Sequence, residues 1–182
     1  MGAHKRQTAP PFLGHFDVTI TEDGRLRLPK GVIQLLQAHQ VRSLRLCALP
    51  WLKALVMCPT ALWDAWIQEA KHRFLCLSTP VGIRTCLSPS TVVQPDARGR
   101  ISIPERLCEH AGLRVGDTAV VVGMEHYLEI WSPGELEQAL LAGETAVRQG
   151  LNNPSLLAIP RRMAALWSLA AEPPALAQKV PT

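Results

Sequence analysis

The sequence predicts a mainly β fold with packed helices, and three observations support this prediction. First, the stretch Asp96–Pro104 (DARGRISIP) has a weaker copy at Thr21–Pro29 (TEDGRLRLP), so the chain contains an internal repeat. Second, each copy joins a turn to a short alternating strand and ends at a proline. Third, an amphipathic helix and two further apolar runs follow each copy. Two such units on one chain favour two halves that share a core.

The second copy has the clearer turn and strand. Asp96 and Gly99 stand at the first and fourth corners of a turn, as in a hairpin loop whose glycine is left-handed. The strand that follows alternates, which predicts Ile101 on the buried face and Arg100 on the outer face. Pro104 lacks a backbone donor but suits the first turn of a helix, so we expect the strand to become a helix there.

The first copy keeps this arrangement with a different turn cap. Gly24 keeps the fourth corner and Pro29 keeps the helix start. Thr21 replaces the aspartate at the first corner, and its hydroxyl caps such a turn more weakly than a carboxylate. The predicted structural motif of both copies therefore comprises Thr21, Gly24, Pro29, Asp96, Gly99, Arg100 and Pro104.

Periodicity predicts the other elements. Trp63 and Trp66 have helical spacing, and we interpret them as core or subunit-contact residues. The Ser-, Thr- and Pro-rich residues 78–95 have the composition of a connector. Strands are expected within 12–20, 44–49, 54–58, 119–122 and 127–131, and helices within 30–40, 59–74, 105–111 and 132–149.

The second copy continues in a pattern typical of one family of DNA-binding folds. Gly-Arg-Ile-Ser-Ile-Pro is followed by Gly112-Leu113, then by Gly116-Asp117 and a valine-rich strand, and this order resembles the DNA-binding half of AbrB and MazE. Two such halves, with Phe12-Leu13-Gly14 before the first and Leu128-Glu129-Ile130-Trp131 closing the second, resemble the MraZ family. The resemblance covers roughly residues 12–150, and the first repeat is divergent.

The resemblance implies how the two repeats are organised. In such proteins the hairpins of two halves interleave into a swapped-hairpin β-barrel, which here would form a pseudo-dimer within one chain. The expected organisation is a flexible basic arm (1–11), a first repeat (12–77), a connector (78–92), a second repeat (93–150) and a C-terminal tail (151–182).

Two arginines of the first copy are candidate DNA contacts. Arg25 and Arg27 share one strand face and lie about 6.6 Å apart along it, similar to the spacing of neighbouring phosphates, so they could bind two phosphates or a guanine edge. Lys30, in the first turn of a helix where the dipole disfavours a cation, is a further candidate. Lys5 and Arg6 of the arm complete the set. A structural role for Arg25 around its turn is the alternative, and for Arg100, which can meet Asp96, we favour that role.

Composition and charge restrict the function classes. The net charge is +4, but residues 1–88 hold 11 Lys and Arg against 5 Asp and Glu, whereas residues 89–182 hold 8 against 10. A polyanion would therefore prefer the first half. The 5 cysteines form no C-x-x-C pair, and no apolar leader or membrane-length stretch is present, so we expect a reduced, cytoplasmic protein without metal or membrane. No catalytic constellation, cofactor motif or small-molecule substrate is indicated.

Three function hypotheses remain. The first is a MraZ-like transcriptional repressor, associated with the nucleoid and acting on a cell-division and cell-wall gene cluster. By resemblance, it would bind tandem direct repeats in double-stranded promoter DNA as a ring-like homo-oligomer. The second is a scaffold that kept the fold and lost DNA binding, because Asp23 replaces a lysine of the family pattern and would repel phosphate. The third is an AbrB/MazE-type antitoxin, which the single acidic residue of the tail (Glu172) disfavours.

Overall fold

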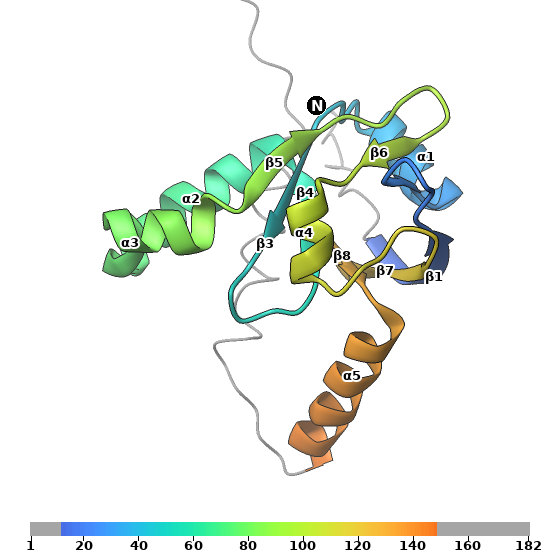
Figure 1. Cartoon of the computed structure of the whole chain (residues 1–182). Coiled ribbons are helices and arrows are strands. Elements are labelled where there is room, and N and C mark those ends of the chain that lie inside the picture. Colours follow the sequence, from blue (N-terminus) through green and yellow to red (C-terminus); the bar gives the residue numbers. More distant parts are fainter. Residues whose placement is uncertain (1–11, 149–182) are drawn as a thin grey trace, which may run out of the picture.

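The computed structural model describes residues 12–148, which form a mainly β fold with helices around it (Figure 1). The strands are β1 (Phe12–Thr19), β2 (Arg25–Arg27), β3 (Leu44–Ala48), β4 (Leu55–Pro59), β5 (Ser90–Val93), β6 (Arg100–Ser102), β7 (Thr118–Glu125) and β8 (Leu128–Trp131). The helices are α1 (Lys30–Ala38), α2 (Thr60–Arg73), η1 (Leu75–Ser78), α3 (Pro80–Gly82), η2 (Ile83–Leu87), α4 (Glu105–His110) and α5 (Pro133–Arg148).

Strands of the two sequence copies pair with one another. The main sheet is antiparallel and six-stranded, in the order β1-β7-β8-β4-β3-β5, while β2 and β6 form a separate two-stranded sheet, here called the ribbon. The pairs β1–β7, β4–β8 and β2–β6 each join a strand of the first repeat (12–77) to a strand of the second repeat (93–150). Neither copy therefore builds the sheet from its own strands alone.

The ladder does not close into the barrel expected from the resemblance. Within residues 12–148, β1 and β5 are the two edges of the main sheet, and β2 and β6 hydrogen-bond only to each other as strands. One isolated bridge, Ile20 to Leu26, links the end of β1 to the ribbon. The two ribbon strands are three residues long and pair along their length with neither β1 nor β5. The ribbon therefore covers an open sheet and does not complete a barrel.

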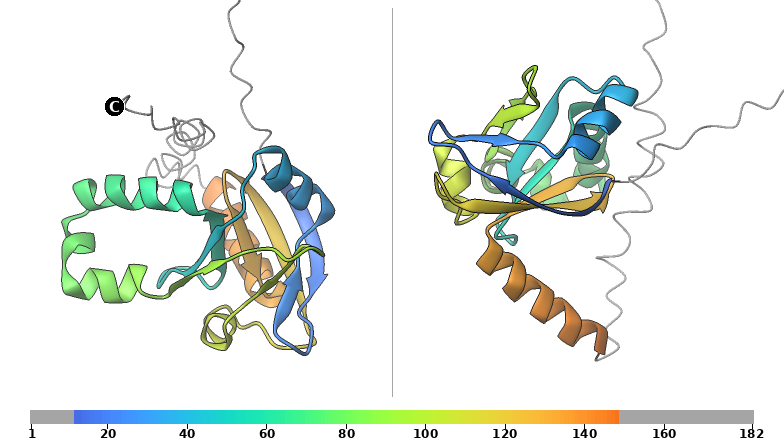
Figure 2. Two further views of the ribbon diagram at one scale, coloured as in Figure 1. Left: turned by 90° about the horizontal axis from the view of Figure 1, so that it is seen from above. Right: turned by 90° about the vertical axis from the view of Figure 1, so that its right-hand side faces the viewer.

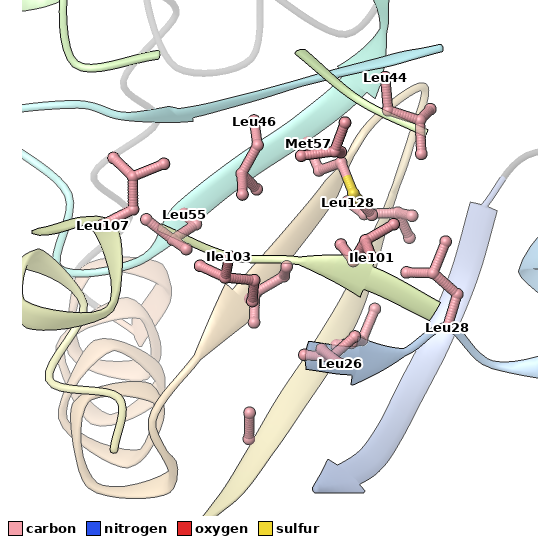
Figure 3. Packing of buried hydrophobic residues seen from close by; sticks show 14 of the residues in the cluster. Leu26, Leu28, Leu44, Leu46, Leu55, Met57, Ile101, Ile103, Leu107 and Leu128 are labelled. Carbon is pink, nitrogen blue, oxygen red and sulfur yellow. The ribbon is translucent and has the colours of Figure 1, made fainter. Parts of the chain in front are cut away.

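The main core lies between the ribbon and one face of the sheet. Leu26 and Ile101, at the centre of the ribbon, are 0% and 1% exposed. Their side chains belong to one cluster with Leu55 and Leu128 of the sheet (Figure 3). Burial of about 25 cal/mol per Å² of apolar surface makes this cluster the chief attachment of the ribbon, because three-residue strands contribute few ladder bonds.

The opposite face of the sheet carries two smaller clusters. Cys47, Val56 and Cys58 lie under Trp63 and Ile67 of α2. A second group under the first turn of α5 consists of Ala54, Val120, Val122, Trp131 and Leu136. The sequence predicts Trp63 and Trp66 to be core or subunit-contact residues; Trp63 lies in the cluster under α2 at 7% exposure, and Trp66 is partly buried against the same cluster.

Two helical segments project from the sheet. In Figure 2, α2 runs out from the sheet, and the chain returns through α3 to β5. Beyond Leu136, α5 leads away from the body (Figure 1), and Leu140 and Leu141 on it are exposed. No helix within residues 12–148 has both the length and the apolar character needed to cross a bilayer.

Candidate nucleic-acid interface

The ribbon presents a row of guanidinium groups on its outer face. Its register places Leu26 opposite Ile101 and Arg27 opposite Arg100. Because side chains alternate along a strand, Leu26 and Ile101 point into the core while Arg25, Arg27 and Arg100 point outward, and both Arg25 and Arg27 are exposed. Like charges directly opposite each other weaken a strand pair. The Arg27–Arg100 pair is therefore not explained by the stability of the ribbon.

The turn of the second copy holds Arg100 in place. One carboxylate oxygen of Asp96 accepts hydrogen bonds from the backbone N–H groups of Arg98 (2.9 Å) and Arg100 (2.8 Å). The other accepts from Arg100 Nε (2.8 Å) and lies 2.7 Å from Nη2. These bonds, the Arg100 backbone N–H first and its guanidinium next, lower the pKa of Asp96 to about 2. The contact predicted between Arg100 and Asp96 is present.

The turn of the first copy holds Arg25 through a carboxylate at a different corner. The Thr21 hydroxyl accepts from the Arg25 N–H (3.2 Å) and bonds to the Asp23 carboxylate, and Asp23 Oδ2 lies 3.2 Å from Arg25 Nε. The Thr21 hydrogen bond is the main cause of the lowered pKa of Asp23, to which Arg25 also contributes. The carboxylate has thus moved from the first to the third corner. Sequence reasoning treated Asp23 only as a repulsive charge and missed this pairing.

A groove of about 1010 Å³ lies beside the ribbon. It is bounded by β1, by α1 and by the turn of the second copy. Four cationic and two acidic residues line it: Arg27, Lys30, Arg42, Arg98, Asp17 and Asp96. Within residues 12–148 these four cations form no ion pair. The groove therefore carries unneutralised positive charge.

The structure brings some of the predicted DNA contacts together. Arg27 and Lys30 line one groove, whereas Arg25, which shares the outer ribbon face with Arg27, does not line it. Lys5 and Arg6 lie outside the described residues. Sequence reasoning missed Arg98 and Arg42, which are far apart in the chain. The position of Arg98 between the turn corners was an available signal for it, while nothing in the local sequence marked Arg42.

The described residues contain few groups suited to catalysis or metal binding. Within residues 12–148 no cluster of three or more His, Cys, Asp or Glu side chains is placed to hold a metal ion. Burial raises the pKa of Cys47 to about 12 and also raises that of Cys58, so both thiols stay protonated. Burial likewise raises the pKa of Glu129, whose carboxylate accepts from Trp131 Nε1 (2.9 Å).

Comparison with known proteins places the chain in a family. The family model described as “MraZ protein”, with the further words “antitoxin-like”, matches residues 86–145. The protein named “Transcriptional regulator MraZ” of Thermomicrobium roseum is 32% identical over 140 residues, which cover 73% of this chain and 91% of that protein. This chain belongs to the MraZ family.

Other MraZ proteins are similar to a comparable extent. That of Roseiflexus castenholzii is 30% identical over 140 residues, covering 72% of this chain and 87% of its own length. That of Limosilactobacillus reuteri is 34% identical over 126 residues, covering 66% and 81%. Both carry the name “Transcriptional regulator MraZ”. The solved structure of PHS018 from Pyrococcus horikoshii is 14% identical and covers 64% of this chain and 94% of that one, with a TM-score of 0.32.

Proposed function

We propose that this MraZ family member is a transcriptional regulator that binds double-stranded DNA through the outer face of its ribbon. The observation that carries the proposal is the exposed pair Arg25 and Arg27 on the outer face of a two-stranded ribbon set apart from the main sheet. A two-stranded ribbon has the dimensions that the major groove of B-DNA admits. The names of the related proteins support the same function class.

The contacts within the turns give the three ribbon arginines different roles. Arg27 has no ion pair within residues 12–148, so its whole guanidinium is free to bind a phosphate or a guanine edge. The carboxylate of Asp23 binds Arg25 through Nε, which orients the guanidinium and leaves its terminal nitrogens for DNA. Asp96 binds both Nε and Nη2 of Arg100, so Arg100 mainly fixes the turn.

The finer function follows the resemblance. We propose that the two sequence copies act as a pseudo-dimer, and that several chains assemble into a ring-like homo-oligomer whose copies bind tandem direct repeats. The regulator would be nucleoid-associated and would repress a promoter of a division and cell-wall gene cluster. Exposed apolar residues on the projecting helices support the assembly, since such side chains favour subunit contacts. They include Phe74, Val81, Leu140 and Leu141.

A second candidate function is a scaffold protein that does not bind DNA. The ion pair between Asp23 and Arg25 favours it, because Asp23 supplies locally the negative charge that a phosphate would otherwise provide. The two functions predict opposite results in one experiment, since a scaffold does not retard DNA.

The test is gel retardation of a duplex from the region upstream of the protein's own gene, repeated over a range of salt concentrations. Replacing Arg25 and Arg27 together with Ala should weaken binding and flatten the slope of log K against log salt by about 0.9 per lost phosphate contact. Arg100→Ala is the comparison variant, which should lower stability with little change of slope. An unchanged slope in the double variant would remove Arg25 and Arg27 as contacts. Absence of any retardation by the unaltered protein would favour the scaffold.

A further inference from the structure

The ribbon and its turns are related by an internal two-fold arrangement. The backbone N–H of Leu28 donates to the carbonyl of Gly99 (2.9 Å), and that of Ile103 donates to the carbonyl of Gly24 (3.0 Å). Each copy's strand therefore ends against the turn of the other copy. The register has the same symmetry, with Leu26 opposite Ile101 at its centre.

The same equivalence extends through the helices that follow. Val41 N–H bonds to the carbonyl of Leu36 (2.8 Å) after α1, and Leu113 N–H bonds to that of Cys108 (2.9 Å) after α4. Arg42 and Arg114, each one residue further on, are therefore equivalent. The basic groove, made by the first copy's strand end and helix with the second copy's turn, consequently has an equivalent surface on the other side of the ribbon.

The charges of these two surfaces differ. We call Arg27, Lys30, Arg42 and Arg98 the basic flank, and their equivalents Ser102, Glu105, Arg114 and Asp23 the opposite flank. All of these side chains are exposed. The basic flank carries four positive charges, and Asp17 and Asp96, which also line its groove, leave a net charge of +2. The opposite flank carries one positive and two negative charges, a net charge of −1, and its equivalents of Asp17 and Asp96 are the uncharged Val92 and Thr21. The backbone has kept its internal symmetry while the charges have lost theirs.

We infer that this chain binds the phosphates of the DNA backbone on one side of the ribbon only. The basic flank binds phosphates next to the segment that the ribbon contacts, and the opposite flank makes no phosphate contact. This inference rests on the proposed function and adds Arg42 and Arg98 to the DNA contacts. Glu105 and Asp23 would oppose a phosphate, because like charges at short range repel each other.

One-sided binding gives the chain a direction on DNA. A DNA-binding protein with two equal flanks matches a palindromic site, because the two-fold axis of the protein coincides with that of the site. Unequal flanks remove this match, so each chain fits an asymmetric site in one orientation. Successive chains would then read successive sites in the same direction, as tandem direct repeats require.

Arg42→Ala and Arg114→Ala provide a matched test, because the two arginines occupy equivalent positions on opposite flanks. The probes are a duplex from the region upstream of the gene and a scrambled duplex of the same composition. Arg42→Ala should flatten the salt slope by about 0.9 on both duplexes, which makes the loss of affinity between about 50 and 200 mM salt about 3.5-fold smaller. Arg114→Ala should leave the slope unchanged. Lys30→Ala and Arg98→Ala should behave like Arg42→Ala.

A gain-of-contact variant tests the same inference in the other direction. Glu105→Lys places a lysine at the position equivalent to Lys30 and should steepen the slope on the scrambled duplex. Urea denaturation of each variant establishes that the fold is retained.

Several results would overturn the inference. Equal effects of Arg42→Ala and Arg114→Ala would show that both flanks bind. No effect of either, with the Arg25 and Arg27 double variant still impaired, would refute the basic flank and leave the proposed function standing. Weaker binding of inorganic pyrophosphate by Arg42→Ala, with an unchanged DNA slope, would make the groove a site for a free anion. Failure of the unaltered protein to retard either duplex would refute the proposed function itself.

Discussion

Leu26 should be the residue on which the attachment of the ribbon depends most. It is 0% exposed, lies opposite Ile101 and also forms the isolated bridge with Ile20. Replacing it with Ala removes most of a side chain from the main cluster and leaves a cavity between ribbon and sheet. The expected effect is a large loss of stability, with a ribbon that is less firmly held.

The magnitude follows from burial. Leu→Ala at a fully buried site costs about 2–5 kcal/mol, and the higher part of the range applies where neighbours cannot close the cavity. Leu26 packs against the sheet in the main cluster, and its three-residue strand can shift toward the sheet and close part of the cavity, so we take about 3 kcal/mol, from the middle of the range. With a urea m value of about 2 kcal/mol per M for a protein of this size, the midpoint should fall by about 1.5 M.

Urea denaturation followed by tryptophan fluorescence measures this shift, because Trp63 and Trp131 are buried on the opposite face of the sheet. Leu13→Ala is the matched control, since Leu13 is 61% exposed on the edge strand β1. The control should change the free energy of unfolding by less than about 0.5 kcal/mol. Equal midpoints for the two variants would refute the assignment of Leu26 as the anchor of the ribbon.

Three further predictions concern single residues. Gly99→Ala should destabilise by about 1–3 kcal/mol, because Gly99 has φ +73° and an added Cβ would lie 2.8 Å from Ile33 Cδ1; an unchanged urea midpoint would contradict the tight packing of this turn on α1. Gly31→Ala should instead stabilise by up to about 1 kcal/mol, since it lies in a helix with open space around the new Cβ; a lower midpoint would argue against this. Because burial raises the pKa of Glu129, the native protein takes up its proton more readily than the unfolded chain, and the free energy of unfolding falls as pH rises through the native pKa. Glu129→Gln keeps an acceptor for Trp131 and should lose this pH dependence in urea titrations above about pH 4.5, whereas identical pH profiles would show that Glu129 does not titrate in this way.

Local sequence patterns predicted the elements better than their partners. The turn glycines Gly24 and Gly99 have φ +68° and +73°, as expected for their corners, and α2 occupies Thr60–Arg73 close to its predicted range. Alternation tells which side chains share a face but not which strand lies alongside. The pairings between copies therefore came only from the resemblance, and the open edge at β5 could not be read from periodicity.

The strand β5 was missed altogether. Ser90–Val93 lies between Pro89 and Pro95, and its short alternation is hidden in a Ser-, Thr- and Pro-rich stretch. The repeat held the missing signal, because the strand β1 precedes the turn of the first copy and an equivalent strand should precede the turn of the second.

The candidate site shows the same limit. Arg25 and Arg27 were placed on one strand face by alternation alone, and the structure has them both exposed there. The pairing of Asp23 with Arg25 depends on turn geometry and a hydroxyl bridge, which side-chain charge does not reveal. The groove joins Arg27 to Arg98 through the packing of α1 against a distant turn. Only tertiary structure brings such residues together.

The pairing of β1 with β7 and of β4 with β8 within one polypeptide also affects how such a protein can evolve. In a dimer of identical subunits every substitution is present in both subunits, so a harmful change in one subunit also occurs in the other. A fused pair escapes this constraint, and either half can specialise while its counterpart preserves the shared fold. Association of the halves is then independent of protein concentration, so dilution cannot separate them.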